Sequence, residues 1–453
     1  MSIQERQLLQ APGPRGFPIV GNLHLFLSPN VLLKMMSLRE EYGDVIQWRV
    51  GPRLVHFIND LDAIKRVLQM NNRNYTKAQA YNKLELLLGK GLLTSESDFW
   101  RRQRRLAQPA FHRHKIALLA EGMVGATRRL LEGLEPLAES GEAFDINKWM
   151  MQVTMDIVAR SLFSTALAEE DFQRVANALD FLLHETIRRA MAPWFVELPT
   201  RKNRRYHRHI DELNQIVMRI ISERRESGEK KPDLLGMLLE AHDEETGEGM
   251  DDLQLRDEVM TLFLAGHETT ANALTWLWKV LSHHPTVQKA VVDEVEDVLE
   301  GRDPSADDIA KLTYSRRVLD EVMRLYPPVP FFARRAIQED TLCGYTVPAG
   351  SNVVISPYIL HRLEDLWTNP EGFDPDRFTE EAKKQRNKFA YLPFGGGPRF
   401  CIGNHFAIME ALIVMSMMLQ RYRVDLVPYH PIEFELSLTL RPKHGLLTRL
   451  RPR

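Results

Sequence analysis

The pattern of apolar and polar residues divides the chain into a short part with strands, a long helical part and a mixed C-terminal part. Two runs typical of strands occupy residues 45–50 and 54–58. From 59 to about 301, apolar residues recur every three or four positions, which predicts a series of amphipathic helices. Strand-like runs return over 343–356, separated by the turn signals Gly344-Tyr345 and Pro348-Ala349-Gly350.

The C-terminal part continues this mixture. A proline-rich irregular region covers 369–397, a helix is predicted over about 404–421, and the alternation over 435–440 predicts a terminal strand. We therefore expect a mainly α fold with small β-sheets. Because no stretch has the composition of a linker, we expect a single domain over 1–453, with a β-rich N-terminal part at about 12–60 and a helical bulk with small sheets over 61–453.

Composition narrows the class of protein without identifying it. Of 453 residues, 44% are hydrophobic and 26% are charged, and the formal net charge is -2. These values are ordinary for a globular protein and give no reason to expect nucleic acid as a partner. The first ten residues are polar and no run of about 20 apolar residues occurs, so we expect neither a signal peptide nor a membrane anchor. With the low cysteine content, this predicts a cytoplasmic protein.

Only two cysteines occur, Cys343 and Cys401, which excludes a disulfide framework and a zinc site with several thiolates. Glycines around Cys401 allow positive φ and a close approach of the backbone to a flat or charged group. The amides at the start of the following helix stabilise a thiolate, which is a soft donor for iron. A lone cysteine is more often an inert buried thiol. A metal ligand is favoured here by the surrounding Phe394-Gly395-Gly396-Gly397-Pro398-Arg399-Phe400-Cys401-Ile402-Gly403.

A second candidate site lies in a long apolar helix predicted from Asp251 or Asp252 to Pro285. It contains the segment Ala265-Gly266-His267-Glu268-Thr269-Thr270. Thr269 could serve chemistry, or it could be a back-bonded threonine beside a tolerated glycine, and the residues leave both interpretations open. Residues at helical spacing form one face of this helix, against which a wide ligand could pack. The face comprises Leu262, Ala265, Gly266, Thr269 and Ala273.

Other patterns carry little weight by themselves. Glu321 and Arg324 have the spacing of an ordinary surface ion pair on a helix. Trp100 and Arg104 lie one helical turn apart and together could hold a carboxylate. No motif typical of zinc hydrolases, dinucleotide-binding domains or serine hydrolases occurs. A group of arginines could form a docking surface for an acidic partner, or it could simply be a solvated helix face. The group comprises Arg101, Arg102, Arg105 and Arg113.

Together these motifs resemble those of the cytochrome P450 haem-thiolate monooxygenases over essentially the whole chain. Residues 394–403 resemble the haem-binding loop, and 265–270 resemble the oxygen-activating segment of the family's central helix. Residues 321–324 resemble the motif of the helix behind the haem, and residues 100–104 resemble the haem-contacting helix. Residues 375–378, Pro-Asp-Arg-Phe, resemble the segment that completes a buried Glu-Arg-Arg network. The resemblance implies the cytochrome P450 fold, with the haem between the long central helix and the Cys-loop helix.

The resemblance also implies haem b (iron protoporphyrin IX) and a role for each matching residue. Cys401 would be the iron ligand, with Phe394 packed near its sulfur. Thr269, aided by Glu268, would relay protons to the bound oxygen as a general acid. Ala265 and Gly266 would line the haem face, and the structural network would be Glu321, Arg324 and Arg377. The haem propionates would be bound by Arg399, Trp100, Arg104, Arg334 and Lys77, with Arg335 as the alternative to Arg334.

The family resemblance implies a substrate pocket lined by apolar residues, and therefore a hydrophobic substrate. Fatty acids, terpenoids, steroids and carotenoid-like molecules all remain open. The residues expected to face the pocket are Leu93, Val329, Phe331 and Leu438, with further contributions from Leu88, Phe181 and Met191.

The expected activity is insertion of one oxygen atom of O2 into that substrate, by hydroxylation or epoxidation. Since neither a membrane anchor nor a flavin reductase is recognisable, the resemblance favours a bacterial enzyme. Its electrons would come from a separate ferredoxin or flavodoxin with a reductase, or from a fused reductase absent from this chain. The alternatives are a hydrogen-peroxide-dependent peroxygenase and a non-catalytic haem-thiolate sensor or carrier. The intact pair Glu268 and Thr269 favours the monooxygenase over both.

Overall fold

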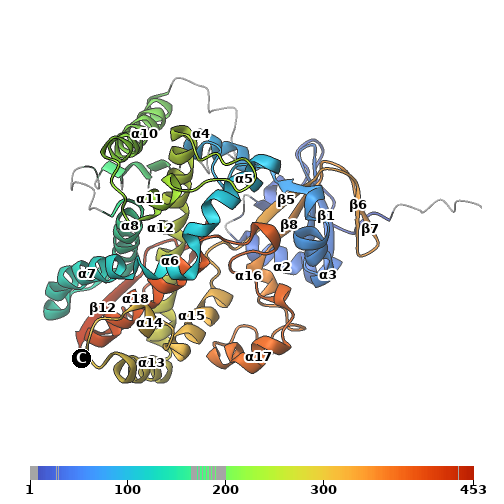
Figure 1. Ribbon diagram of the computed structural model, residues 1–453. Helices are drawn as coiled ribbons and strands as arrows, with labels where there is room; N and C mark the ends of the chain where they lie inside the picture. Colours follow the sequence, from blue (N-terminus) through green and yellow to red (C-terminus); the bar gives the residue numbers. More distant parts are fainter. Residues whose placement is uncertain are drawn as a thin grey trace, which may run out of the picture. The chain divides into compact units, whose positions relative to one another are not determined.

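The computed structural model describes residues 9–453 apart from 27, 29, 165–170, 172, 173, 176, 180, 183, 184, 186–188, 190–199 and 437. Helices dominate and the strands form small sheets, as the sequence predicts (Figure 1). The chain divides into two compact units, each made of two separate stretches. The first unit comprises 1–79 and 323–401, and the second comprises 80–322 and 402–453. The single domain over 1–453 stays a prediction.

The first unit is organised around a five-stranded sheet. Its antiparallel first pair confirms the strands predicted near 45–50 and 54–58. In spatial order the strands are β1 (Val45–Val50), β2 (Arg53–Ile58), β8 (Asn352–Ile355), β5 (Phe332–Ala336) and β3 (Tyr75–Lys77). β2 and β8 run parallel, and the remaining neighbouring pairs are antiparallel.

Short elements complete the first unit. A small hairpin of β6 (Asp340–Leu342) and β7 (Tyr345–Val347) turns at Cys343 and Gly344, which both have positive φ. The region 369–397 is largely irregular, as predicted, but it includes a short helix, α17 (Glu380–Gln385). The other elements are α1 (Leu23–Phe26), α2 (Val31–Tyr42), α3 (Leu61–Lys65), the π-helical η1 (Arg66–Met70), η2 (Asn72–Asn74), α16 (Pro357–Leu360), η6 (Pro375–Phe378), η7 (Lys388–Ala390) and η8 (Gly397–Arg399).

The core of the second unit is α12 (Asp252–His283), which confirms the long helix predicted before Pro285. Asp251 caps it by accepting a hydrogen bond from the amide of Gln254 at 2.7 Å. Most of its residues are buried. It packs most extensively against α8 (Ile146–Phe163) and also contacts α10 (Arg201–Ser227) and α18 (Asn404–Arg421) (Figure 1). The bounds of α18 are those that the sequence predicts.

Further helices and two small sheets surround this core. In the described part of the chain, no helix is both long enough and apolar enough to cross a membrane. The helices are η3 (Gln79–Lys83), α4 (Glu85–Leu88), α5 (Ser97–Ala107), η4 (Gln108–Phe111), α6 (Arg113–Ala117), α7 (Ala120–Ser140), α11 (Leu234–Leu239), α13 (Pro285–Leu299), α14 (Ala306–Ile309) and α15 (Thr313–Leu325), which ends in the first unit.

The terminal strand predicted over 435–440 is wrong in its extent. Residues 435 and 436 belong to β10 (Phe434–Leu436), and residue 440 begins β11 (Leu440–Pro442). The two strands are antiparallel, with Leu436 opposite Leu440. No glycine, proline or asparagine marks the chain reversal, so the alternation reads through it. The last strand is instead β12 (Leu447–Pro452), between β4 (Phe144–Asp145) and β9 (Tyr422–Leu426).

Candidate functional site

The loop that carries Cys401 lies in the first unit and is held in shape by its own backbone. The amide of Cys401 donates to the carbonyl oxygen of Phe394 at 3.0 Å, and the amide of Phe400 donates to Gly397 at 3.0 Å. Gly395 and Gly397 have φ values of 73° and 69°, a conformation that other residues rarely adopt. The chain therefore turns back on itself and leaves Cys401 exposed.

Gly397 also brings this loop against a segment that is distant in sequence. A Cβ added to Gly397 would lie 1.8 Å from the carbonyl oxygen of Leu68 in η1. The position of η1 is fixed in turn by Arg66, which donates to Oδ1 of Asp340 at 2.6 Å, while Tyr75 donates to Oδ2 at 2.8 Å. No side-chain pattern marks this support, because the contact with the cysteine loop is made by backbone atoms.

The second cysteine is poorly suited to bind a metal. Cys343 lies in the β6–β7 turn, and the residue as a whole is exposed. Partial desolvation of its thiol and a hydrogen bond with Asp60 raise the pKa of Cys343 to about 12. Such a thiol carries almost no thiolate at neutral pH. This leaves Cys401 as the candidate ligand.

The register of the first unit's sheet places two predicted haem contacts together. Lys77 on β3 is directly opposite Arg334 on β5, so both side chains lie on the same face of the sheet. Arg335 is opposite Thr76 and lies on the other face. Lys77 and Arg334 place two positive charges on one face, whereas Arg335 is opposite an uncharged threonine, so the face with Lys77 and Arg334 is the more basic of the two.

Arg324 is the centre of a buried network in the first unit. Glu321 and Arg324 are both fully buried, so the surface role that their spacing ordinarily indicates is wrong. The Arg324 guanidinium donates to three backbone carbonyls, those of His361, Pro370 and Gly372, at 2.8, 2.6 and 2.8 Å. Arg377 is partly exposed and donates to the carbonyl of Asn369 at 2.9 Å.

One stripe of α12 stays accessible while the residues beside it are buried. Ala265 is exposed and Gly266 and Thr269 are partly exposed, as is Leu262. Ala273, which was also predicted on this face, is buried instead. The hydroxyl of Thr269 donates to the carbonyl oxygen of Ala265 at 2.7 Å. The threonine is thus back-bonded, and its oxygen still has lone pairs with which to accept a hydrogen bond.

Glu268, beside that stripe, is buried and contacts a residue that sequence reasoning missed. Its Oε1 accepts a hydrogen bond from the hydroxyl of Thr439 at 2.7 Å. Thr439 itself accepts from Nδ2 of Asn272 at 3.0 Å. A polar Asn272 in an apolar stretch, one helical turn after Glu268, was the available signal for this contact.

The N-terminal half of α12 holds the segment that leads to Leu93. Asp257 accepts a hydrogen bond from the amide of Lys90 at 2.7 Å, and Glu258 accepts one from the amide of Leu92 at 3.1 Å. Charged acceptors make these hydrogen bonds stronger than neutral ones. The two carboxylates therefore fix the path of the chain just before a residue that is predicted to face the substrate.

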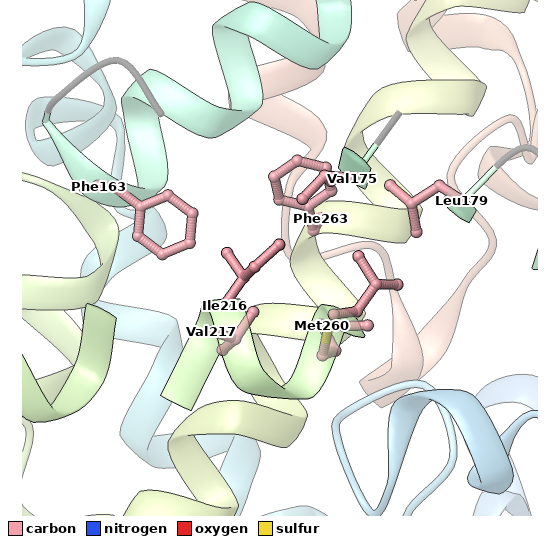
Figure 2. A pocket seen from close by; sticks show the side chains of 8 residues that line it. Phe163, Val175, Leu179, Ile216, Val217, Met260 and Phe263 are labelled. Atoms are coloured by element: carbon pink, nitrogen blue, oxygen red, sulfur yellow. The ribbon is translucent and has the colours of Figure 1, made fainter. Parts of the chain in front are cut away.

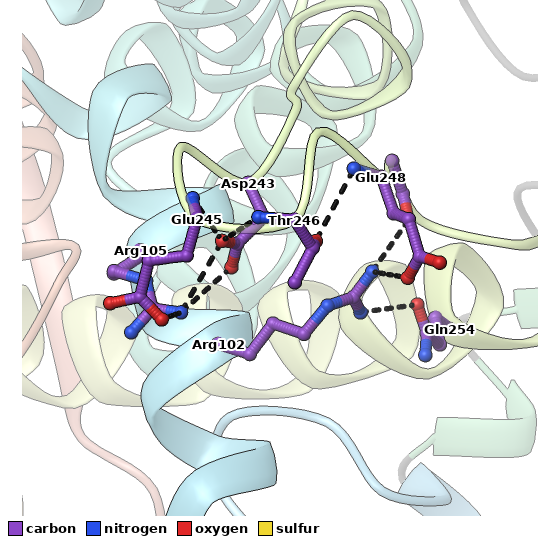
Figure 3. A network of polar contacts seen from close by, with 8 residues as sticks. Arg102, Arg105, Asp243, Glu245, Thr246, Glu248 and Gln254 are labelled. Atoms are coloured by element: carbon purple, nitrogen blue, oxygen red, sulfur yellow. Dashed lines mark hydrogen bonds and ion pairs between the residues drawn. The ribbon is translucent and has the colours of Figure 1, made fainter.

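The arginines of α5 are largely committed to contacts within the second unit (Figure 3). Arg105 donates to Oδ2 of Asp243 and to Oε2 of Glu245, both at 2.9 Å. Arg102 donates to Oε1 of Gln254 at 3.3 Å and to the carbonyl of Gly249 at 3.0 Å. Neither arginine is part of a merely solvated face, because both hold the loop 243–249. On the same helix, Arg101 pairs with Asp98, and Trp100 and Arg104 are partly exposed.

The remaining predicted residues are distributed over both units. Arg399 and Phe394 are partly exposed in the cysteine loop. Leu88 is fully buried, which argues against its expected contact with substrate. The centre of the Phe181 ring lies 4.2 Å from the guanidinium carbon of Arg205. Met191 lies outside the described residues. Of the four residues expected to face the pocket, Leu438 is exposed, and the other three are partly exposed, namely Leu93, Val329 and Phe331.

Figure 2 shows a separate apolar pocket in the second unit. Side chains of α8, α10 and α12 line it together with Val175 and Leu179. None of the predicted haem or substrate contacts is among its lining residues, which are Phe163, Val175, Leu179, Leu213, Ile216, Val217, Met260 and Phe263.

The chain is similar over most of its length to proteins of one known family. The model of the family described as cytochrome P450 matches residues 11–449. The chain belongs to the cytochrome P450 family. A crystal structure of the cytochrome P450DA heme domain superposes on this P450 with a TM-score of 0.90, at 30% sequence identity, and the match covers 98% of both chains. The protein is therefore a haem-dependent oxidoreductase with the cytochrome P450 fold.

Several curated relatives of this P450 are bacterial oxygenases. It is 37% identical over 435 residues to cyclooctatin synthase of Streptomyces melanosporofaciens, covering 95% of this chain and 93% of that protein. Cyclooctat-9-en-7-ol 5-monooxygenase of the same organism is 36% identical over 427 residues, with coverage of 94% and 91%. Pentalenene oxygenase of Streptomyces avermitilis is 31% identical over 453 residues, with coverage of 97% and 99%. This P450 is accordingly a monooxygenase for a hydrophobic substrate.

The residues present fit a haem. The first unit offers an exposed cysteine in a glycine-rich loop and a pair of cations on one sheet face. The second unit offers an accessible stripe of small residues along α12. A thiol donor, cations for carboxylates and a small-residue surface for a flat ring are the chemistry that iron protoporphyrin requires.

Proposed function

We propose that this P450 binds haem b through Cys401 and oxidises a terpenoid by inserting one oxygen atom of O2. The observation that carries the substrate class is the similarity to oxygenases named for cyclooctat-9-en-7-ol and pentalenene. The apolar side chains of Leu93, Val329, Phe331 and Leu438 support a hydrocarbon-rich substrate. Hydroxylation and epoxidation are both consistent with this chemistry.

The ligand assignment rests on the cysteine loop. When bound, the haem supplies an iron centre for O2 activation, and a thiolate ligand favours O–O cleavage. Cys401 provides the thiolate, and the residue is exposed at the surface of its loop. The hydrogen bond from the Cys401 amide to the Phe394 carbonyl holds these two residues of the loop together, which supports packing of Phe394 beside the ligand.

The propionate assignment rests on charge. Arg334 and Lys77 face the same side of their sheet, which favours Arg334 over Arg335 as the contact. Arginine forms two parallel hydrogen bonds to a carboxylate, and the indole N–H of Trp100 adds a further donor. The proposed set of propionate contacts is Arg399, Trp100, Arg104, Arg334 and Lys77.

The proton relay rests on α12. The Thr269 hydroxyl donates to the Ala265 carbonyl, so its oxygen can accept a hydrogen bond from a water, and after rotation the hydroxyl would donate to an acceptor at the haem face. Glu268 can supply the replacement proton from its buried carboxyl group. Adjacent acid and hydroxyl groups support an O2-dependent monooxygenase, because a peroxide-driven enzyme or a sensor has no need to deliver these protons.

The proposed electron donor is a cytoplasmic ferredoxin or flavodoxin with its reductase. Because Arg102 and Arg105 are engaged with the loop 243–249, the docking surface must rely on other cations, of which Arg113 is exposed. An acidic donor would be attracted to such a cation at low ionic strength.

Two measurements test the proposal. Cys401→Ala should abolish the red-shifted Soret band that thiolate ligation gives to the reduced carbon monoxide complex, whereas Cys343→Ala should keep it. A wild-type band in Cys401→Ala would refute the ligand. For the substrate class, purified holoenzyme should show a spin-state shift with cyclooctat-9-en-7-ol or pentalenene, the compounds named in its relatives. A response to fatty acids alone, or to neither class, would refute the terpenoid assignment.

A further inference from the structure

A directional chain of hydrogen bonds ends on Glu268 in the second unit. Nδ2 of Asn147 on α8 donates to Oγ1 of Thr275 at 3.1 Å and to Oδ1 of Asn272 at 3.5 Å. These contacts orient the Asn272 amide, so that its Nδ2 faces Thr439 and donates to it at 3.0 Å. Thr439 then donates its only proton to Oε1 of Glu268 at 2.7 Å.

Burial makes this direction consequential. Asn272 is fully buried, and Thr439 and Glu268 are each 4% exposed, so water cannot readily substitute for a missing donor. A hydroxyl that already accepts from an amide N–H has its proton directed to the carboxyl oxygen. Hydrogen bonding of this kind favours the ionised form of a carboxylic acid.

We propose that Thr439 is a positioning residue for the proton relay, which holds the Glu268 carboxyl oriented and ionised between proton deliveries. This inference rests on the proposed role of Glu268. Thr439 lies immediately before β11 and next to Leu438, outside the motifs that identify the family. Thr439 is thus 171 residues away along the chain from the Glu268 carboxyl group that it contacts.

The test compares variants of the holoenzyme by two readouts. Infrared difference spectra follow the carbonyl stretch of the protonated Glu268 carboxyl group against pH, with Glu268→Gln identifying the band. Product coupling and peroxide release follow the relay itself. Thr439→Val should move the infrared midpoint to higher pH by about one unit, since the ionised form loses a hydrogen-bond donor. The limb of the coupling profile at which Glu268 gives up its proton should move with it. Thr439→Ser should restore both.

Controls separate this inference from the function on which it rests. Thr127→Val removes another buried threonine hydroxyl, which donates to Met123 in α7, and should leave both profiles unchanged. In the Glu268→Gln background, Thr439→Val should add no further uncoupling. An unchanged infrared midpoint in Thr439→Val overturns the inference. If Glu268→Gln leaves coupling intact, the relay assignment fails, and the infrared titration still decides whether Thr439 controls Glu268.

Discussion

Arg324 and His361 exchange hydrogen bonds in the first unit: Nη1 of Arg324 donates to the His361 carbonyl at 2.8 Å, and Nδ1 of His361 lies 3.2 Å from the Arg324 carbonyl. The amide of Leu392 donates to Nε2 of His361 at 2.8 Å. Since Nε2 is the acceptor, Nδ1 must carry the proton of a neutral ring. Burial, assisted by nearby guanidinium groups, lowers the pKa of His361 well below its usual value.

His361 should therefore make the fold sensitive to acid. Its folded pKa lies below the unfolded value, so its contribution is present above about pH 6.5 and is lost as the pH falls. His361→Phe should lower stability at pH 8 by about 2 kcal/mol or more, because a buried carbonyl and a buried amide lose their partners. Thermal unfolding across pH measures both effects. The variant should show a shallower acid limb, and the exposed His114→Phe should match wild type; parallel profiles for His361→Phe and wild type would contradict this account.

The two neighbouring arginines of β5 should differ in their effect on haem retention. Arg334→Gln removes a charge-assisted contact worth about 2 kcal/mol, so loss of haem to excess apomyoglobin should accelerate roughly tenfold or more. Arg335→Gln is the matched control on the other sheet face, and its effect should stay under about twofold. The opposite ranking would assign the propionate to Arg335.

How much of this was foreseeable depends on whether the determinants are local. The bounds of α12 and α18 follow from nearby chemistry, such as the Asp251 cap and Pro285, and the sequence predicts both correctly. The hairpin between β10 and β11 lacks a turn residue and was missed.

The candidate site divides in the same way. Contiguous motifs such as 394–403 and 265–270 are readable, because their residues are neighbours in sequence. Thr439, Leu68 and His361 reach their partners through tertiary structure, and each is a common residue type with no local pattern. From one sequence, nothing distinguishes them from other buried residues of the same kind.

Gly91 should influence substrate affinity without affecting haem binding. A Cβ at this position would lie 2.1 Å from Oγ1 of Thr261 and 2.6 Å from the Asp257 carbonyl, so Gly91→Ala must displace the segment before Leu93. Overpacking of this kind costs about 1–3 kcal/mol, and we expect roughly tenfold weaker binding of a terpenoid in a spectral titration. Gly122→Ala, where an added Cβ meets no atom within 4 Å, should bind as wild type does. Equal affinities in the two variants would contradict the predicted position of Leu93.

Charge reversal should separate electron transfer from stability on the α5–α6 surface. Arg113→Glu should slow reduction by an acidic ferredoxin about tenfold at low salt, with the difference shrinking as ionic strength rises, and should leave thermal unfolding unchanged. Arg105→Glu should instead lower the unfolding midpoint, because it places a negative charge beside the buried Asp243. Unchanged reduction of Arg113→Glu at all salt concentrations would place the docking surface elsewhere.

The contact between Gly397 and Leu68 limits how this centre could be transplanted. Ten residues carry the recognisable cysteine motif, but their backbone rests on η1, which depends on Arg66 and Asp340 for its position. If residues 394–403 alone were moved into another scaffold, they would lose the contact with η1 that supports their backbone. The smallest portable haem-thiolate module from this chain is therefore discontinuous, and must include 66–75 and the β6 strand with the cysteine loop.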